Sequence, residues 1–107
     1  YKMIAGNMSI REQEVLKGLV DVLKKHLAPG KIILFGSRAK QNFNSNSDFD
    51  LAVDGERVDI RLQRKINEDI DKASGLYSVD VVFLNSVNKA FREIVLKTGK
   101  VVYERNP

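Results

Sequence analysis

Residues 35–51, F-G-S-R-A-K-Q-N-F-N-S-N-S-D-F-D-L, join a Gly-Ser turn to two aspartates at the head of an apolar run. Residues i and i+2 of a β-strand point to the same face, so Asp48 and Asp50 would present two carboxylates side by side. At an effective dielectric constant of about 20, two charges about 5 Å apart repel by roughly 3 kcal/mol. A divalent cation relieves this repulsion, and oxygen-only ligands suit Mg²⁺ or Mn²⁺. The pair therefore indicates a metal site.

The Gly36-Ser37 turn directly follows an earlier apolar run. Its backbone N–H groups and the serine hydroxyl can bind a phosphate. A phosphate-binding turn close to metal-binding carboxylates suggests nucleotide chemistry. The turn lacks the G-x-x-x-x-G-K-[ST] pattern of a P-loop, which argues against that class of NTPase.

The length of 107 residues predicts a single domain over 1–107. The absence of cysteine excludes disulfides and thiolate metal sites. No stretch approaches the ~18 consecutive apolar residues of a membrane span. The first residues also lack a signal-peptide pattern, so we expect a cytoplasmic location. The net charge of +4 is compatible with nucleic acid or a polyphosphate ligand. The stronger interpretation is that the basic residues form solvated helix faces: Lys17, Lys24, Lys25, Arg61, Arg64 and Lys65.

Hydrophobic periodicity predicts the element order α-β-β-α-β-α-β. The segment S-I-R-E at 9–12 has the form of a capping box and begins a helix that Pro29-Gly30 ends. The expected strands are 31–35, 48–53, 77–84 and 100–103, with helices at 58–73 and from a cap at Ser86 or Asn88 to Gly99. The loop between the first two strands is too short for a regular crossover, so these strands should be antiparallel. We expect an α+β (mixed α/β) fold with about four strands in a mixed sheet and helices mainly on one face.

A third carboxylate, Asp80, lies inside the apolar run 79–84. An aspartate in such a place is costly unless it is paired or binds a metal. One interpretation is an edge residue satisfied by a lysine or a backbone N–H. The other is that Asp80 joins Asp48 and Asp50, where three carboxylates can hold metal and accept the proton of an attacking hydroxyl.

The motifs G-S-R-A-K, S-D-F-D-L and V-D-V-V, in this order, resemble the minimal nucleotidyltransferases of the DNA polymerase beta superfamily. The resemblance covers nearly the whole chain, from the first helix to the last strand. It implies transfer of a nucleoside monophosphate from an NTP, with ATP as the expected donor, to an acceptor hydroxyl, with release of pyrophosphate. It further implies three nucleotide-binding residues and three that ligate Mg²⁺ or Mn²⁺ and carry the catalysis. The first set is Gly36, Ser37 and Arg38, and the second is Asp48, Asp50 and Asp80.

The same resemblance implies a protein partner. Small members of this family are paired with a separately encoded helical protein of HEPN type, which they often adenylylate as antitoxins. At this length we expect no separate acceptor domain, which makes a partner physically reasonable. The alternative is a protein-binding or antitoxin module that keeps the fold with little chemistry. A nucleic-acid binder is disfavoured because the aromatic residues fall on core-facing positions. The acceptor stays open among a protein tyrosine, a small aminoglycoside-like hydroxyl and an RNA end.

Three further residues carry separate expectations. Gln41 stands where the family commonly has a second glycine, which would cost about 1 kcal/mol if that position needs a positive φ. Phe43 lies in a polar loop, where a loop or partner contact and stacking on a base are both open. His26 is the single histidine, so it cannot form a usual zinc site, and we expect it on the surface.

Overall fold

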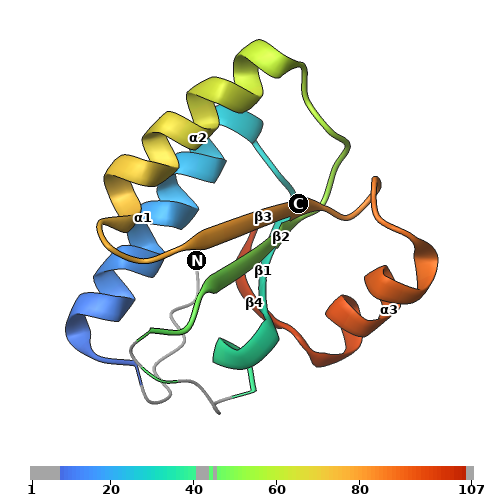
Figure 1. Cartoon of the computed structure of the whole chain (residues 1–107). Coiled ribbons are helices and arrows are strands. Elements are labelled where there is room, and N and C mark those ends of the chain that lie inside the picture. The colour runs from blue at the N-terminus through green and yellow to red at the C-terminus, as the bar shows by residue number, and fades with distance from the viewer. Residues whose placement is uncertain (1–7, 41–43, 45, 106–107) are drawn as a thin grey trace.

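Four strands form one mixed sheet in the order β3-β2-β1-β4 (Figure 1). The computed structural model describes residues 8–40, 44 and 46–105. The strands are β1 (Lys31–Phe35), β2 (Phe49–Val53), β3 (Val79–Phe83) and β4 (Lys100–Glu104). β1 pairs antiparallel with both β2 and β4, whereas β3 runs parallel to β2. This confirms the predicted mixed sheet with antiparallel first strands, and it leaves β3 and β4 as the outer strands.

The helices are α1 (Ile10–Leu27), the short 3₁₀ helix η1 (Gly36–Arg38), α2 (Ile60–Ser74) and α3 (Lys89–Thr98). α1 begins at the predicted capping box: Ser9 Oγ accepts the Glu12 N–H at 3.1 Å, and Glu12 Oε1 accepts the Ser9 N–H at 2.9 Å. Among the described residues, no helix is long and apolar enough to cross a membrane.

Side-chain caps also set the starts of α2 and α3. α2 begins two residues later than predicted because Asp59 is its N-cap, accepting the Leu62 N–H at 2.9 Å. Of the two candidate caps for α3, the structure uses Asn88, whose Oδ1 accepts the Phe91 N–H at 2.8 Å. Ser86 instead accepts a backbone N–H from the loop before α2.

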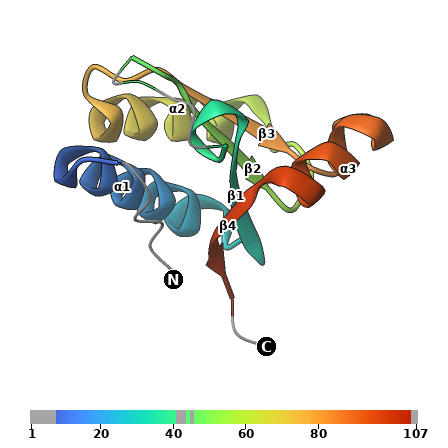
Figure 2. The ribbon, with the colours of Figure 1, turned by 90° about the horizontal axis from the view of Figure 1, so that it is seen from below.

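α1 and α2 cover one face of the sheet and α3 lies against the other, as Figure 2 shows. The strands are apolar on both faces because each face packs on a helix layer. Leu34 and Leu51 belong to the larger core under α1 and α2, whereas Ile33, Ala52 and Val95 form the smaller core under α3. The expectation that helices lie mainly on one face therefore holds for two of the three long helices.

Candidate active site

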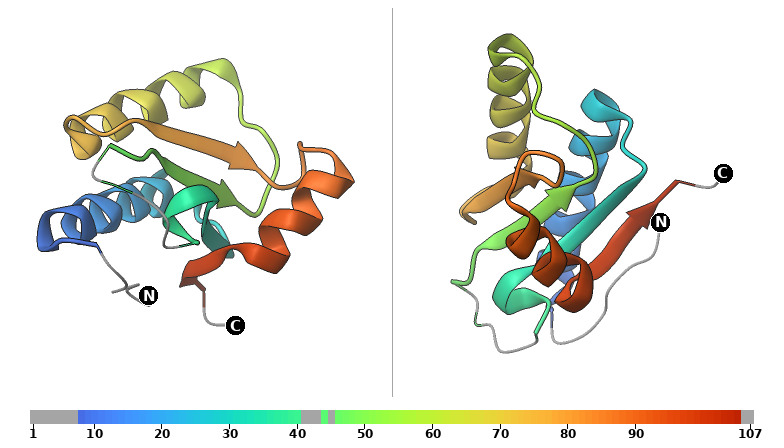
Figure 3. Two further views of the ribbon diagram at one scale, coloured as in Figure 1. Left: turned by 60° about the horizontal axis from the view of Figure 1, so that its bottom comes forward. Right: turned by 90° about the vertical axis from the view of Figure 1, so that its right-hand side faces the viewer.

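The candidate site lies at one end of the sheet, where the end of β1 meets the beginnings of β2 and β3 (Figure 3). Phe35, the last residue of β1, is the register partner of Asp50 in β2. Asp50 is in turn the register partner of Asp80 in β3. Register partners point to the same face of a sheet, so the two carboxylates are neighbours on adjacent strands. They share the α3 face, because Phe49 and Leu51 point into the opposite core.

The carboxylate of Asp50 is close enough to Asp48 and Asp80 for their charges to act on it. Burial raises the pKa of Asp50 above its ordinary value, and the charges of Asp80 and Asp48 together with a hydrogen bond to Asp80 raise it further. Asp50 is half-buried, whereas Asp48 and Asp80 are exposed. The structure thus brings the three carboxylates singled out in the sequence close enough to repel one another.

These carboxylates are neighbours, but they are not arranged as a complete metal-coordination site. Within the described residues, no three or more His, Cys, Asp or Glu side chains are grouped so that they could hold a metal ion. The set nevertheless fits a hard cation, because its donors are all oxygen. Burial and then the charges of Asp80 and Asp48 raise the pKa of Asp50, and a bound cation would offset both effects. The side chains of Asp48 and Asp80 are exposed and can turn toward Asp50.

Gly36 brings the Gly-Ser turn into direct contact with the Asp50 carboxylate. Its φ of 74° lies in the left-handed region that favours glycine. A Cβ at this position would overlap Oδ2 of Asp50. The next residue, Ser37, is partly exposed in η1. The predicted phosphate-binding turn therefore lies next to one of the predicted metal ligands.

Arg38 lies beneath this surface. Its side chain is 0% exposed and its Nη1 donates to Glu12 Oε2 at 2.5 Å. Nε and Nη2 both donate to the Ser47 carbonyl, at 3.1 and 2.9 Å. A guanidinium buried in this way does not face a bound triphosphate. Although Arg38 follows Gly36 and Ser37 in η1, its side chain therefore does not join them at the predicted nucleotide-binding surface. Sequence reasoning missed Glu12, whose only visible signal was its place in the capping box.

The family model described as "Polymerase beta, Nucleotidyltransferase" matches residues 17–107. The chain belongs to this nucleotidyltransferase family. A curated relative, the protein adenylyltransferase MntA of Aphanizomenon flos-aquae, is 35% identical over an alignment of 91 residues, and the match covers 68% of this chain and 55% of the relative. The chain thus spans about half the length of the curated relative it matches.

Solved structures show the same nucleotidyltransferase fold. A toxin–antitoxin crystal structure with AMP-PNP has a chain with a TM-score of 0.71 and 24% identity, covering 84% of this chain and 73% of its own. The structure of a tri-AMPylated Shewanella oneidensis HEPN toxin in complex with an MNT antitoxin has a TM-score of 0.66 and 21% identity. That match covers 90% of this chain and 74% of the other. At these identities, the similarity to the solved structures shows that this chain shares their fold.

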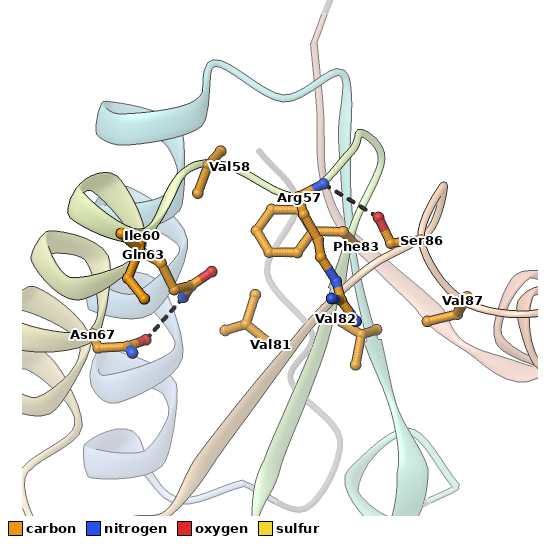
Figure 4. Close-up of a pocket in the computed structure, with 10 residues that line it drawn as sticks. All are labelled: Arg57, Val58, Ile60, Gln63, Asn67, Val81, Val82, Phe83, Ser86 and Val87. Carbon is orange, nitrogen blue, oxygen red and sulfur yellow. Dashed lines mark hydrogen bonds between the residues drawn. The ribbon is translucent and has the colours of Figure 1, made fainter.

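A cavity of about 470 Å³ in this nucleotidyltransferase domain lies away from the carboxylates, between α2 and β3 (Figure 4). Val81, Val82 and Phe83 of β3 line it, but none of the predicted site residues does. Its polar groups already bond one another: Gln63 Nε2 donates to Asn67 Oδ1 at 3.0 Å, and the Arg57 N–H donates to Ser86 Oγ at 3.2 Å.

The expectation that His26 is a surface residue is wrong. Its Nε2 lies 2.6 Å from Asp69 Oδ2, and its side chain is only 10% exposed. The pair joins α1 to α2, and the packing of these two helices explains its burial. The predictions for Gln41 and Phe43 concern residues outside the described part of the chain.

We expect the His26–Asp69 pair to stabilise the domain in a pH-dependent way. The hydrogen bond from His26 lowers the pKa of Asp69 below its ordinary value of 3.8, against the opposing effect of burial. A carboxyl whose pKa is lowered by folding stabilises the native state at pH values well above its ordinary pKa. The stabilisation is lost as the pH falls through the lowered pKa. Urea unfolding of the parent and of Asp69→Asn should show a difference at pH 7 that shrinks toward pH 3.

The matched control is Asp71→Asn on the same helix, since Asp71 is exposed. Its unfolding free energy should follow that of the parent at both pH values. An Asp69→Asn variant as stable as the parent at pH 7, or a stability difference that does not change with pH, would contradict the role of the pair.

Proposed function

We propose that this chain is a metal-dependent nucleotidyltransferase that moves AMP from ATP to an acceptor hydroxyl and releases pyrophosphate. The contact between the Gly36 turn and the Asp50 carboxylate carries the proposal, because it sets a phosphate-binding backbone directly against a cluster of three carboxylates. Membership of the nucleotidyltransferase family supports the same reaction class.

In this proposal Gly36 and Ser37 bind the triphosphate and orient its α-phosphate toward β3. Asp48, Asp50 and Asp80 would hold Mg²⁺ or Mn²⁺, which when bound neutralises charge on the phosphates and polarises them. Arg38 would contribute by holding the loop rather than by touching the nucleotide.

Asp80 would also accept the proton of the acceptor hydroxyl. The hydroxyl oxygen forms a bond to the α-phosphorus as the bond from that phosphorus to the pyrophosphate oxygen breaks. Asp80 is suited to this role because it is exposed and β3 is an outer strand of the sheet. An acceptor can therefore approach it from solvent, even when that acceptor is part of a large molecule.

The acceptor and partner that we propose are one protein of HEPN type, in a two-protein toxin–antitoxin system. The adenylyltransferase relative and the structure of an AMPylated HEPN toxin with its MNT antitoxin support this proposal. The open approach to Asp80 is compatible with a protein acceptor. The competing possibility is an antitoxin module that binds its partner with little chemistry. It predicts that the partner still binds when the three aspartates are replaced.

The test is transfer of label from ATP labelled at the α-phosphate to a HEPN-type partner in the presence of Mg²⁺. Loss of a metal-ligating carboxylate in Asp48→Asn should reduce transfer by at least about 100-fold. The exposed Asp71 lies outside the site, so Asp71→Asn should transfer like the parent. Transfer retained by Asp48→Asn would overturn the proposal. A parent without turnover, whose Asp48, Asp50 and Asp80 triple variant still binds the partner tightly, would favour the binding module.

A further inference from the structure

A buried ion pair between Glu12 and Arg38 lies under the candidate site. The Arg38 side chain is 0% exposed and that of Glu12 is 9% exposed. The pair joins residues 26 positions apart, one in the first turn of α1 and the other at the end of η1. Burying a guanidinium costs several kcal/mol unless it is fully paired, so a fold that keeps one in this place needs its partners to be well ordered.

The contacts of the guanidinium converge on the segments that carry the three aspartates. Nε and Nη2 donate to the carbonyl of Ser47, the residue before Asp48. The guanidinium carbon lies 4.1 Å from the centroid of the Phe49 ring, and Phe49 stands between Asp48 and Asp50. At these distances the guanidinium restrains the backbone on both sides of Asp48.

The same guanidinium also reaches the strand that carries Asp80. It lies 5.4 Å from the ring centroid of Tyr77, three residues before Asp80. The rings of Tyr77 and Phe49 meet edge to face at 5.4 Å. The Phe49 N–H also donates to the Ser78 carbonyl at 2.9 Å, which ties the beginnings of β2 and β3 together. Every candidate metal ligand is thus within three residues of a group that contacts Arg38 or a ring beside it.

Glu12 fixes Arg38 to the helix layer. Its Oε1 accepts the Ser9 N–H in the capping box, and its Oε2 accepts from Arg38. Burial by itself would raise the pKa of Glu12, but hydrogen bonds from Arg38 and Ser9 and the charge of Arg38 outweigh it and lower the pKa. Glu12 is therefore ionised at neutral pH and serves as a fixed counter-ion.

We propose that Glu12 and Arg38 are positioning residues, which set the spacing of Asp48, Asp50 and Asp80 so that the three can share a divalent cation. The inference rests on the proposed function, and it assigns to this pair the metal affinity of the site rather than contact with the nucleotide. A purely structural pair would affect the free energy of unfolding and leave metal affinity unchanged.

The decisive variant is the double substitution Glu12→Gln/Arg38→Met. Glutamine preserves the capping box, and methionine fills much of the arginine volume against the aromatic rings. Replacing a buried ion pair by uncharged residues is often neutral or stabilising, so we expect the variant to fold. Glu14→Gln/Lys40→Met is the matched control, because it makes the same two chemical changes at exposed positions close by in the sequence.

Mn²⁺ binding, followed by calorimetry without nucleotide, is the first measurement. We expect the dissociation constant of the double variant to rise about 10- to 100-fold, as for other residues that orient metal ligands. The control should stay within about two-fold of the parent, and circular dichroism and thermal melting report the fold of each variant. A folded double variant with the parental affinity would overturn the inference.

NMR relaxation of the Asp48 amide is a second measurement that needs no metal. Its order parameter should fall from about 0.85 in the parent toward about 0.6 in the double variant, and should stay high in the control. If the parent binds no Mn²⁺, the proposed function fails, yet this measurement still decides whether the pair orders the segment. An order parameter that is unchanged in the double variant would refute the positioning role.

Discussion

We expect Asp50→Asn to reduce nucleotidyl transfer strongly and to make the metal-free protein more stable. Asp50 is the residue on which the charges of Asp48 and Asp80 act, so its neutralisation removes a proposed metal ligand and the repulsion between these charges. We expect transfer to fall by about 100- to 1,000-fold, the cost of losing one strong electrostatic contact to the reacting groups. The melting temperature should rise by a few degrees, since about 1 kcal/mol shifts it by about 4–8 °C in domains of roughly this size.

This opposition between stability and activity separates a functional carboxylate from a structural one. A carboxylate that is paired for stability would lower the melting temperature when neutralised. Asp71→Asn removes the same charge from an exposed site on α2 and should change neither quantity. Thermal melting without metal and the transfer assay with Mg²⁺ give the two values. A variant that is less stable and fully active would contradict the account of this site.

Gly36→Ala has the second largest expected effect, because it disturbs the turn and the carboxylate together. The positive φ costs an alanine about 1–2 kcal/mol. The new Cβ would also overlap the Asp50 carboxylate, and forced overpacking costs a further 1–3 kcal/mol, roughly. We expect the unfolding free energy to fall by about 2–5 kcal/mol. ATP affinity should fall as well, because the turn can no longer approach Asp50.

Gly55→Ala is the matched control. Gly55 also has a positive φ, of 146°, but nothing lies within 4 Å of the Cβ that alanine would add. It therefore measures the conformational penalty without the overlap. Urea unfolding and ATP binding of both variants should separate the two costs. If Gly36→Ala matches Gly55→Ala in stability and also binds ATP like the parent, the turn does not belong to the site.

The sequence predicted the order of elements and the cluster of aspartates because both follow from local patterns. The capping box marked the start of α1, and short apolar runs marked the strands. An Asp-x-Asp at the beginning of β2 and an aspartate near the beginning of β3 become neighbours once the two strands pair in parallel. The spacing along the chain suggested the Asp48–Asp50 pair, whereas the pairing of β2 with β3 that brings Asp80 beside it is seen only in the structure.

The two side-chain pairs that join distant segments could not be predicted in the same way. Glu12 and Arg38 are 26 residues apart, and His26 and Asp69 are 43 apart. Each pair forms because α1 packs against another segment, and no local spacing signals that contact. In the sequence, His26 next to two lysines resembles a solvated helix end, and Arg38 beside the Gly-Ser turn resembles a phosphate ligand. In both cases the tertiary packing of α1 decides the role.

The most direct test of the central claim is calorimetry of ATP binding, with and without Mg²⁺, on the parent and on Asp50→Asn. We expect the parent to bind ATP in a Mg²⁺-dependent way and the variant to lose this binding. Such a result would place nucleotide and metal together at the beginnings of β2 and β3. ATP binding that is equally strong without Mg²⁺, or that Asp50→Asn retains in full, would contradict it.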